Sequence, residues 1–198
     1  MAKATTTFLD EFLSAARGCL ALVIGNRQAS SFFDFRQVGL VGSFIAILVG
    51  MAVQAFVPQL FGIGGGAPAG AAAGAIMLGG VALGVQYGVG YLVLRLLGRS
   101  DGFIPFVVVQ NWVTLFQSIL AVAIIVIFGH PMALSEDGQM VELTSGSIPF
   151  LALGIVAMIV WVNIARLILT LRPAHVALFV FVQLGAAFML QPILGAAI

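Results

Sequence analysis

Charged residues are scarce in this chain. Only 8% of its 198 residues are Asp, Glu, Lys or Arg, against about 25% in an ordinary soluble domain, whereas 62% are apolar. The mean hydropathy is +1.18. A soluble core of this size could not cover so much apolar surface, so the composition predicts a protein that lipid solvates. The net charge of +1 gives no general attraction to nucleic acid, and we expect no nucleic-acid partner.

Cysteine is nearly absent as well, and the long apolar runs have no charged residue or histidine in their middle. Cys19 is the only cysteine, which excludes an intramolecular disulfide and a cysteine-based zinc site. No Asp, Glu, Lys, Arg or His falls in the middle of a long apolar run, where pumps, proton-coupled carriers and intramembrane metalloenzymes usually need one. The sequence therefore predicts a non-enzymatic protein with no catalytic residue, no metal ligand and no cofactor.

Five uncharged runs are long enough to cross a hydrocarbon core, which takes about 20 helical residues. Pro58 is expected to end the first run, the glycines between 62 and 66 to form a turn, and Pro105 and Pro149 to lie in the first turns of the third and fourth helices. We predict an all-α fold, a polytopic membrane protein whose five transmembrane helices form one domain, residues 37–198. The runs cover residues 38–57, 67 or 71–94, 103–128, 148–165 and 173–198.

The N-terminal segment, residues 1–36, is predicted to be cytoplasmic and to contain an amphipathic interfacial helix. Arg17 interrupts its apolar stretch, which argues against a signal peptide. Thr7 can cap the helix, with Asp10 three residues further on. Such a helix most simply lies in the headgroup plane as an anchor beside the bundle, and a partner-binding helix is the alternative. Its apolar positions recur at helical spacing: Phe8, Leu9, Phe12, Leu13, Ala16, Leu20, Val23 and Ile24.

All eight Lys and Arg residues lie before the first run or in alternate connections. The positive-inside rule places these segments in the cytoplasm. We therefore predict a multi-pass protein of a bacterial inner membrane, with its N-terminus in the cytoplasm and its C-terminus outside. The cations are Lys3, Arg17, Arg27 and Arg36 before the first run, Arg95 and Arg99 between the second and third, and Arg166 and Arg172 between the fourth and fifth.

The longest connection on the outside, residues 130–146, is predicted to form a solvated hairpin. Asp137-Gly138 indicates its turn, between extended arms at Pro131–Leu134 and Gln139–Leu143. Its three acidic residues lack the spacing of a calcium loop, so we expect no metal there.

Three glycines recur at four-residue spacing in the second predicted span: Gly80, Gly84 and Gly88. Small residues at this spacing form a groove that lets another helix approach closely. We expect helix packing at this groove, either within the chain or against a second copy.

The third predicted span carries a polar stripe. Gln110, Thr114 and Gln117 share one face of the helix, and Gln86 and Gln183 are expected at comparable depth in the second and fifth spans. An unpaired amide in hydrocarbon is costly. One expectation is therefore a set of hydrogen bonds between helices that fixes the bundle. The other is a polar cavity for a lipid headgroup or a small solute.

Four arginines are expected together on the cytoplasmic side: Arg95, Arg99, Arg166 and Arg172. Their ordinary role is to orient the spans and to extend towards the interface. An anionic-lipid site between helices would use the same residues.

The order of these features resembles that of the Yip1-type small membrane proteins. The likeness consists of a cytoplasmic N-terminal segment, five closely spaced spans, a glycine-rich second span that runs into Gly90-Tyr91, and an external C-terminus, and it covers the chain from Phe32 onward. The family's acidic-Leu-x-Gly-Pro signature is absent, and the corresponding stretch reads Ser31-Phe32-Phe33-Asp34-Phe35. The resemblance implies a non-enzymatic membrane organiser or trafficking-type protein with membrane-protein partners.

Two functions follow as alternatives. The first is a non-catalytic membrane protein that acts by helix packing, as a membrane organiser or as an accessory subunit of a larger complex. Its partners would be membrane lipids and either another membrane protein or a second copy of the chain. The second is a transporter or permease for a lipid or a small neutral solute. The lack of charge within the spans and the glycine groove favour the first, and the polar stripe favours the second.

Overall fold

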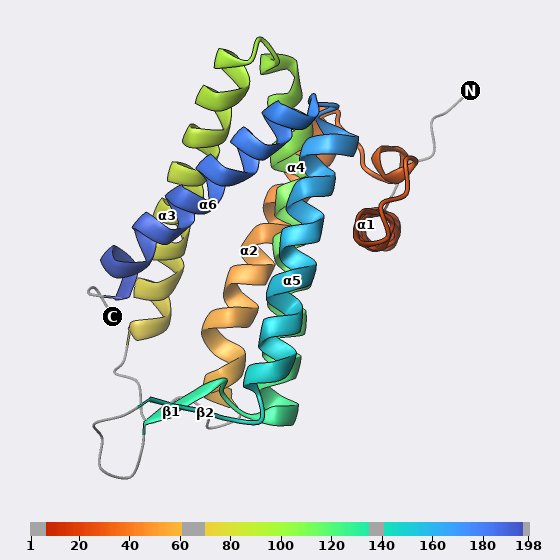
Figure 1. The fold of residues 1–198 in the computed structure, drawn as a ribbon. Coiled ribbons are helices and arrows are strands. Elements are labelled where there is room, and N and C mark those ends of the chain that lie inside the picture. The colour runs from red at the N-terminus through yellow and green to blue at the C-terminus, as the bar shows by residue number, and fades with distance from the viewer. Residues whose placement is uncertain (1–6, 61–69, 135–140, 196–198) are drawn as a thin grey trace.

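The computed structural model describes residues 7–60, 70–134 and 141–195 (Figure 1). This part of the chain is almost entirely helical, with one short two-stranded ribbon. In chain order its elements are α1 (Phe8–Val23), η1 (Ala29–Phe32), α2 (Gln37–Leu60), α3 (Ala71–Leu96), η2 (Ser100–Gly102), α4 (Phe103–Phe128), β1 (Met132–Leu134), β2 (Val141–Leu143), α5 (Ser147–Asn163), η3 (Ile164–Ile168) and α6 (Pro173–Gly195).

Among the described residues, five helical stretches are long and apolar enough to cross a membrane, which confirms the predicted number of candidate spans. Pro105 and Pro149 lie third in α4 and α5, as predicted. Pro58 does not end the first helix, because α2 continues to Leu60. In an apolar surrounding the other backbone hydrogen bonds of a helix have no substitute, so one missing N–H does not stop it. The candidate spans are Gln37–Phe56, Ala72–Leu96, Ser100–Phe128, Ser147–Ile168 and Pro173–Leu190.

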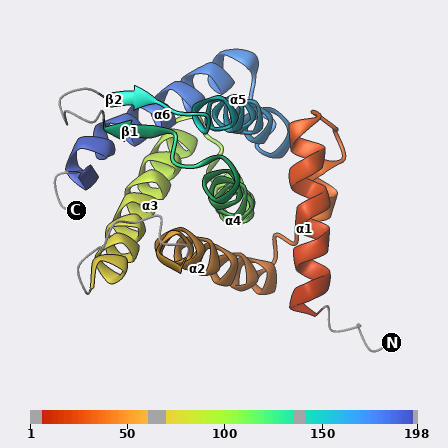
Figure 2. The same cartoon turned by 90° about the horizontal axis from the view of Figure 1, so that it is seen from below.

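The spans form two groups. Helices α2, α4 and α5 lie alongside one another, and α3 and α6 pair beside them (Figures 1 and 2). The most extensive contact joins α2 and α4, which run in the same direction. A Cβ atom built at Gly50 of α2 would lie 3.1 Å from the Cα of Leu115 in α4, so the two backbones come close there. Such an approach is possible only where a side chain is missing.

Helices α3, α4 and α6 converge at Gly90. A Cβ atom built there would lie 2.6 Å from the Phe106 ring of α4 and 2.7 Å from Nε2 of Gln183 in α6. Phe106 also meets Phe179 of α6 edge to face, with ring centroids 5.3 Å apart. The Phe106, Phe179 and Gln183 side chains are buried, so this junction is part of the core.

Helix α1 begins at the predicted cap. The Thr7 hydroxyl oxygen accepts a hydrogen bond of 3.3 Å from the backbone N–H of Asp10, and the Asp10 carboxylate accepts one of 3.1 Å from the N–H of Thr7. These two bonds satisfy N–H groups that a helix start otherwise leaves without partners.

Helix α1 lies across α2, α4 and α5 rather than along them (Figure 2). In its first half Phe12 packs on Phe116 and Trp112 of α4, with ring centroids 5.1 and 6.2 Å away. In its second half the Leu22 carbonyl oxygen accepts a hydrogen bond of 2.7 Å from the side-chain amide of Asn163 in α5. The helix is therefore docked on the bundle at both ends.

The predicted hairpin arms are confirmed where the structure describes them, at Met132–Leu134 and Val141–Leu143, and the start of the second predicted arm at Gln139 lies outside the described residues. Strands β1 and β2 pair in antiparallel fashion, with Met132 opposite Leu143 and Leu134 opposite Val141. The predicted turn at Asp137-Gly138 lies outside the described residues, as does the glycine turn at 62–66.

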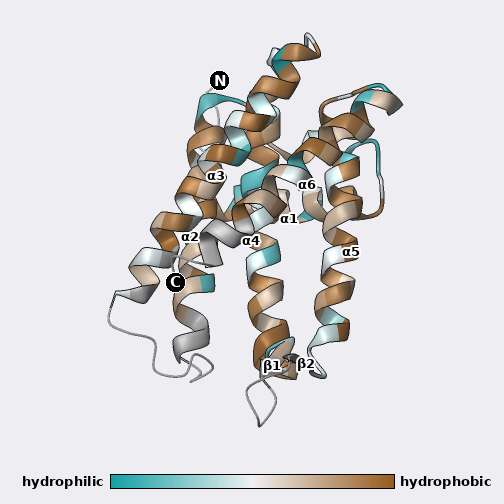
Figure 3. Cartoon of the chain, turned by 60° about the vertical axis from the view of Figure 1, so that its left-hand side comes forward, coloured by the Kyte–Doolittle hydropathy of each residue, from teal (hydrophilic) through white to brown (hydrophobic). Residues whose placement is uncertain are grey.

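Apolar residues cover the outer surfaces of the spans. Figure 3 shows hydrophobic ribbon along most of the length of the helices. Met77, Phe181 and Ile127 are each at least 70% exposed although they are large and apolar. In water this surface would be costly, whereas lipid accommodates it, so the outward-facing side chains agree with the composition.

Candidate functional site

The glycine groove of α3 is open. Cβ atoms built at Gly84 and Gly88 would meet nothing within 4 Å, and one at Gly80 would meet only the Met51 side chain, at 3.9 Å. The α3 span is also the least buried of the five, with 11% inside the protein. Among the described residues no helix packs into this groove, so packing within the chain finds no support there. The close approach occurs instead at Gly90, which the four-residue spacing did not single out.

A hydrogen-bonded network joins α2, α3 and α4 at Asn111. The buried Asn111 side chain donates from Nδ2 to the Ser43 hydroxyl oxygen at 3.0 Å, and its Oδ1 accepts from the Tyr87 hydroxyl. The Ser43 hydroxyl in turn donates to the Leu40 carbonyl oxygen at 2.8 Å. The predicted polar stripe did not include Asn111, and sequence reasoning did not predict this network. The available signal was a set of isolated polar residues within long apolar runs.

The five residues predicted to form a polar cavity are divided among separate surroundings. Gln110 is buried, and its Nε2 lies 3.5 Å from the hydroxyl of Thr114, one turn further on. Gln183 of α6 donates from Nε2 to the backbone carbonyl oxygen of Gln86 in α3 at 3.3 Å. The contact between Gln183 and Gln86 is a hydrogen bond between helices, which is the kind of contact that the first expectation for the polar stripe describes.

Gln117 lines a cavity of about 220 Å³ between α1, α4 and α5, and none of the other four residues lines it. Its side-chain nitrogen is buried and has no hydrogen-bond partner among the described residues. Burial raises the pKa of the Cys19 thiol, which also lines this cavity, to about 12. The thiol is therefore protonated at neutral pH and is a poor nucleophile. The other lining residues are apolar: Ala16, Leu20, Val23, Val113, Phe116, Leu120, Leu153, Val156 and Val160.

The four predicted lipid-binding arginines fall into two groups. Arg99 and Arg172 line one cavity of about 410 Å³, together with His175. Arg95 and Arg166 are exposed and do not line it. Sequence reasoning missed His175, although its place three residues after Arg172, in the first turn of the last span, was the available signal.

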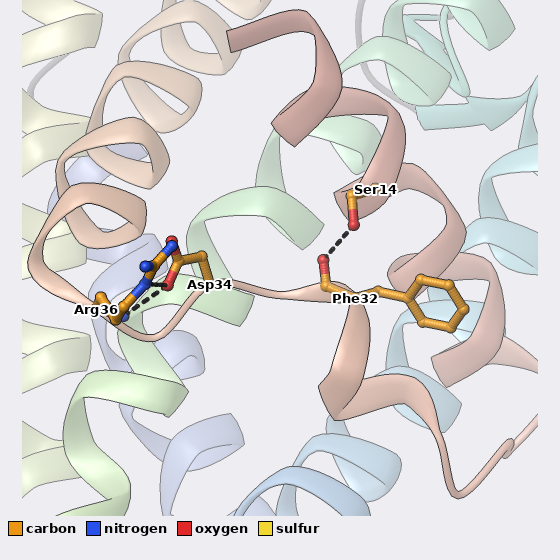
Figure 4. Close-up of polar contacts among 4 residues, drawn as sticks. All are labelled: Ser14, Phe32, Asp34 and Arg36. Atoms are coloured by element: carbon orange, nitrogen blue, oxygen red, sulfur yellow. Dashed lines mark hydrogen bonds and ion pairs between the residues drawn. The ribbon is translucent and has the colours of Figure 1, made fainter. Parts of the chain in front are cut away.

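A second polar cavity, of about 320 Å³, lies between α1, η1 and the start of α2. Two interactions connect pairs of residues that line this cavity (Figure 4). The Arg36 side chain pairs with Asp34, with 2.8 Å between Nε and Oδ1, and the Ser14 hydroxyl donates to the Phe32 carbonyl oxygen at 2.7 Å. The described residues contain no group of three His, Cys, Asp or Glu side chains that could hold a metal ion.

Glu11 projects from α1 between this cavity and α2. A Cβ atom built at Gly42 would lie 2.4 Å from its Oε2, so the carboxylate packs directly on the α2 backbone. Its Oε1 is buried without a hydrogen-bond partner in the described part of the chain. Burial, and then the negative charge of Asp34, raise the pKa of Glu11 above its usual range. This carboxylate therefore takes up a proton more readily than an exposed one.

Comparison with protein families, curated proteins and solved structures finds no match for this chain. The resemblance to Yip1-type proteins accordingly stays an expectation drawn from the order of sequence features.

Proposed function

We propose that this chain is a non-enzymatic integral membrane protein that acts by helix packing, as a membrane organiser or as an accessory subunit of a larger membrane complex. The open glycine groove of α3 carries this proposal. A glycine inside a helix costs about 0.5–1 kcal/mol relative to alanine. At Gly84 and Gly88 no neighbour in the described chain uses the space that the missing side chain leaves. A helix from another chain could use it.

The residues at both ends of the groove are consistent with a packing site for a partner helix. Met77 and Tyr91 lie seven residues before and after Gly84, so they share its face of α3. Both are exposed. Larger side chains at each end of a row of glycines would fix where along α3 a second helix packs. The partner in this proposal is another membrane protein or a second copy of the chain.

The membrane location rests on the five candidate spans and their exposed apolar side chains. We propose a bacterial inner membrane, with the N-terminus and the arginine-bearing connections in the cytoplasm. Helix α1 then lies in the interface plane, because it crosses the spans and exposes both apolar and charged residues. These exposed residues are Leu9, Leu13, Leu20, Asp10 and Arg17.

Transport of a lipid or a small neutral solute is the alternative function, and the cavity at Gln117 is the observation in its favour. Of the five residues predicted to form a polar cavity, Gln117 is the one that lines this cavity. The apolar lining suits a hydrocarbon chain better than a hydrophilic solute. The groove therefore supports helix packing more directly than this cavity supports transport.

Gly84→Leu tests the proposed function. The leucine side chain would fill the groove, so a partner helix could no longer approach the backbone of α3. In native mass measurements of protein released with mild detergent, we expect the parent chain to run with a partner chain and the variant to run alone. Gly154→Leu is the matched control, because Gly154 of α5 is also exposed and its built Cβ meets nothing within 4 Å.

Assembly that is lost in Gly84→Leu and kept in Gly154→Leu would support the proposal. Peptide sequencing of the partner chain would then distinguish a second copy from a different protein. The proposal is wrong if the parent chain released from native membranes with mild detergent runs alone. It is also wrong if Gly84→Leu assembles like the parent, because this face then meets lipid.

A further inference from the structure

Two arginines and a histidine converge on one cavity at the end of the bundle where the arginine-bearing connections lie. The cavity, of about 410 Å³, lies between the connection that follows α3 and the connection that leads into α6. Arg99 comes from the first connection, Arg172 from the second, and His175 from the first turn of α6. From this arrangement we infer a binding site for a phosphate group.

The charge of the site supports this inference. No acidic residue is among the side chains that line the cavity. Asp101 lies near it, with 3.5 Å between its Oδ1 and Nε of Arg99, but its side chain is 74% exposed. The side chains of Arg172 and His175 make no hydrogen bond or ion pair with other described residues. They are therefore free to bind an anion, and charge-assisted hydrogen bonds from guanidinium to phosphate are among the stronger ones.

The backbone around the cavity adds to its positive character. Arg172 and His175 flank the start of α6, where the first N–H groups of a helix have no partner within the helix. The N-terminal end of a helix also carries a partial positive charge. An anion in the cavity would face this end as well as the arginine side chains.

Contacts between Arg99 and Thr170 join the two connections. Thr170 has a φ of 49°, and among the described residues it is the one non-glycine residue with a positive φ. L-residues rarely adopt this conformation. Arg99 donates to the Thr170 hydroxyl oxygen at 3.0 Å and lies 3.4 Å from its carbonyl oxygen. These contacts keep Arg99 beside the turn that leads to Arg172, so the site is arranged before a ligand arrives.

The phosphate group has two chemical sources, the headgroup of an acidic phospholipid and free phosphate in solution. The cavity lies at the end of α3 and the start of α6, where headgroups lie if these helices span the membrane as proposed. The lipid source rests on that proposed membrane location, whereas binding of free phosphate does not. The two sources are therefore tested in separate arms.

Arg172→Gln is the test variant, because the Arg172 side chain makes no hydrogen bond or ion pair with the described residues and its neutralisation leaves the Arg99–Thr170 contacts intact. In the first arm, protein from vesicles of phosphatidylcholine with phosphatidylglycerol is stripped with detergent, and native mass measurements count the retained phosphatidylglycerol. In the second arm, lipid-free protein is titrated with inorganic phosphate and its thermal stability is followed. We expect the variant to weaken binding in one arm on the order of tenfold, the usual effect of one charge-assisted hydrogen bond.

Arg95→Gln is the matched control, since it removes the same charge one turn before Arg99 but outside the cavity. A loss confined to Arg172→Gln in the first arm would assign a lipid headgroup, and in the second arm free phosphate. His175→Phe, which obstructs the cavity without changing an arginine, should reproduce the loss. Equal losses in Arg172→Gln and Arg95→Gln would indicate general surface charge and overturn the site. Unchanged binding of both probes in Arg172→Gln would overturn it as well.

Discussion

The side-chain amide of Asn163, in the fourth span, donates a hydrogen bond of 2.7 Å to the carbonyl oxygen of Leu22 in the crosswise helix α1. The two residues are 141 positions apart in the sequence. Asn163 is buried, and the Leu22 carbonyl also accepts from the backbone N–H of Gly25 at 3.1 Å. The end of α1 is thus tied to a span by a specific bond and not only by apolar contact.

Asn163→Leu should loosen the docking of α1. The Leu22 carbonyl keeps its bond to Gly25, so the cost should be about 1 kcal/mol, typical of one net hydrogen bond. Amide hydrogen exchange in residues 18–26 should speed up while the spans stay protected. Ser145→Ala is the control, because it also removes one side-chain bond to a carbonyl, the 2.9 Å contact with Phe128. An unchanged exchange rate in Asn163→Leu would show that α1 does not depend on this bond.

Asn111 and Tyr87 should show energetic coupling. In the double-mutant cycle of Asn111→Leu with Tyr87→Phe, we expect a coupling free energy of about 0.6–1.7 kcal/mol, the range from average to largest for hydrogen bonds between membrane helices. Tyr87→Phe retains the edge-to-face contact with Phe106, so the cycle isolates the hydroxyl. Thermal unfolding in detergent provides the four stabilities. A cycle of Asn111→Leu with Tyr91→Phe should give no coupling, and equal values for the two cycles would contradict the network.

Gly90→Ala should destabilise the fold, and Gly88→Ala should not. A Cβ at Gly90 would lie 2.6 Å from the buried Phe106 ring, so we expect a cost of about 1–3 kcal/mol, the usual cost of overpacking. A Cβ at Gly88 meets nothing within 4 Å, and alanine favours the helix. Thermal retention of the monodisperse peak in detergent compares the two. Equal melting of Gly90→Ala and the parent would show that the three helices do not converge as described.

Lowering the pH from 7 to 5 should stabilise the parent chain through Glu11. Burial and the charge of Asp34 raise the pKa of Glu11 in the folded state above the ordinary value of 4.5. Glu11 therefore contributes its full stabilisation of the folded state below pH 4.5, and this contribution is lost as the pH rises through the raised pKa. Hydrogen bonds from Thr7 lower the pKa of Asp10, so the contribution of Asp10 changes only below about pH 4 and does not interfere.

Glu11→Gln is the variant that isolates this effect. It should melt at a higher temperature than the parent at pH 7, because no charge then lies against Gly42. The difference between variant and parent should shrink as the pH falls to 5. A difference that does not vary with pH would rule out titration of Glu11 in this range.

The spans, the Thr7 cap and the hairpin arms could be predicted because each depends on local sequence. A long apolar run forms a helix in lipid whatever it packs against, and a cap needs only residues three positions apart. The α1 contacts at Asn163 and Trp112 could not be predicted, since they join segments that are distant in the sequence and are not marked by any local pattern.

The polar and glycine residues illustrate the same limit. Gly80, Gly84 and Gly88 have the spacing of a packing face, yet the described chain packs at Gly90 and Gly50. Periodicity shows which residues share a face, but not which face meets a neighbour. In the same way the spacing grouped Gln117 with Gln110, whereas Gln117 lies at the α1 cavity and Gln110 bonds within α4. The rotation of each helix about its axis, which decides these contacts, follows from packing of all five spans.

The proposed function and the lipid arm of the phosphate-site inference both rest on the five-span topology, and cysteine labelling tests this topology most directly. Single cysteines at Ser100 and Ser145, both exposed, are placed in a Cys19→Ala background, and intact cells are treated with an impermeant maleimide. With five spans and a cytoplasmic N-terminus, the cysteine at 145 should be labelled from outside, and the one at 100 only after the membrane is opened. Labelling of the cysteine at 100 in intact cells, alone or together with 145, would contradict this topology.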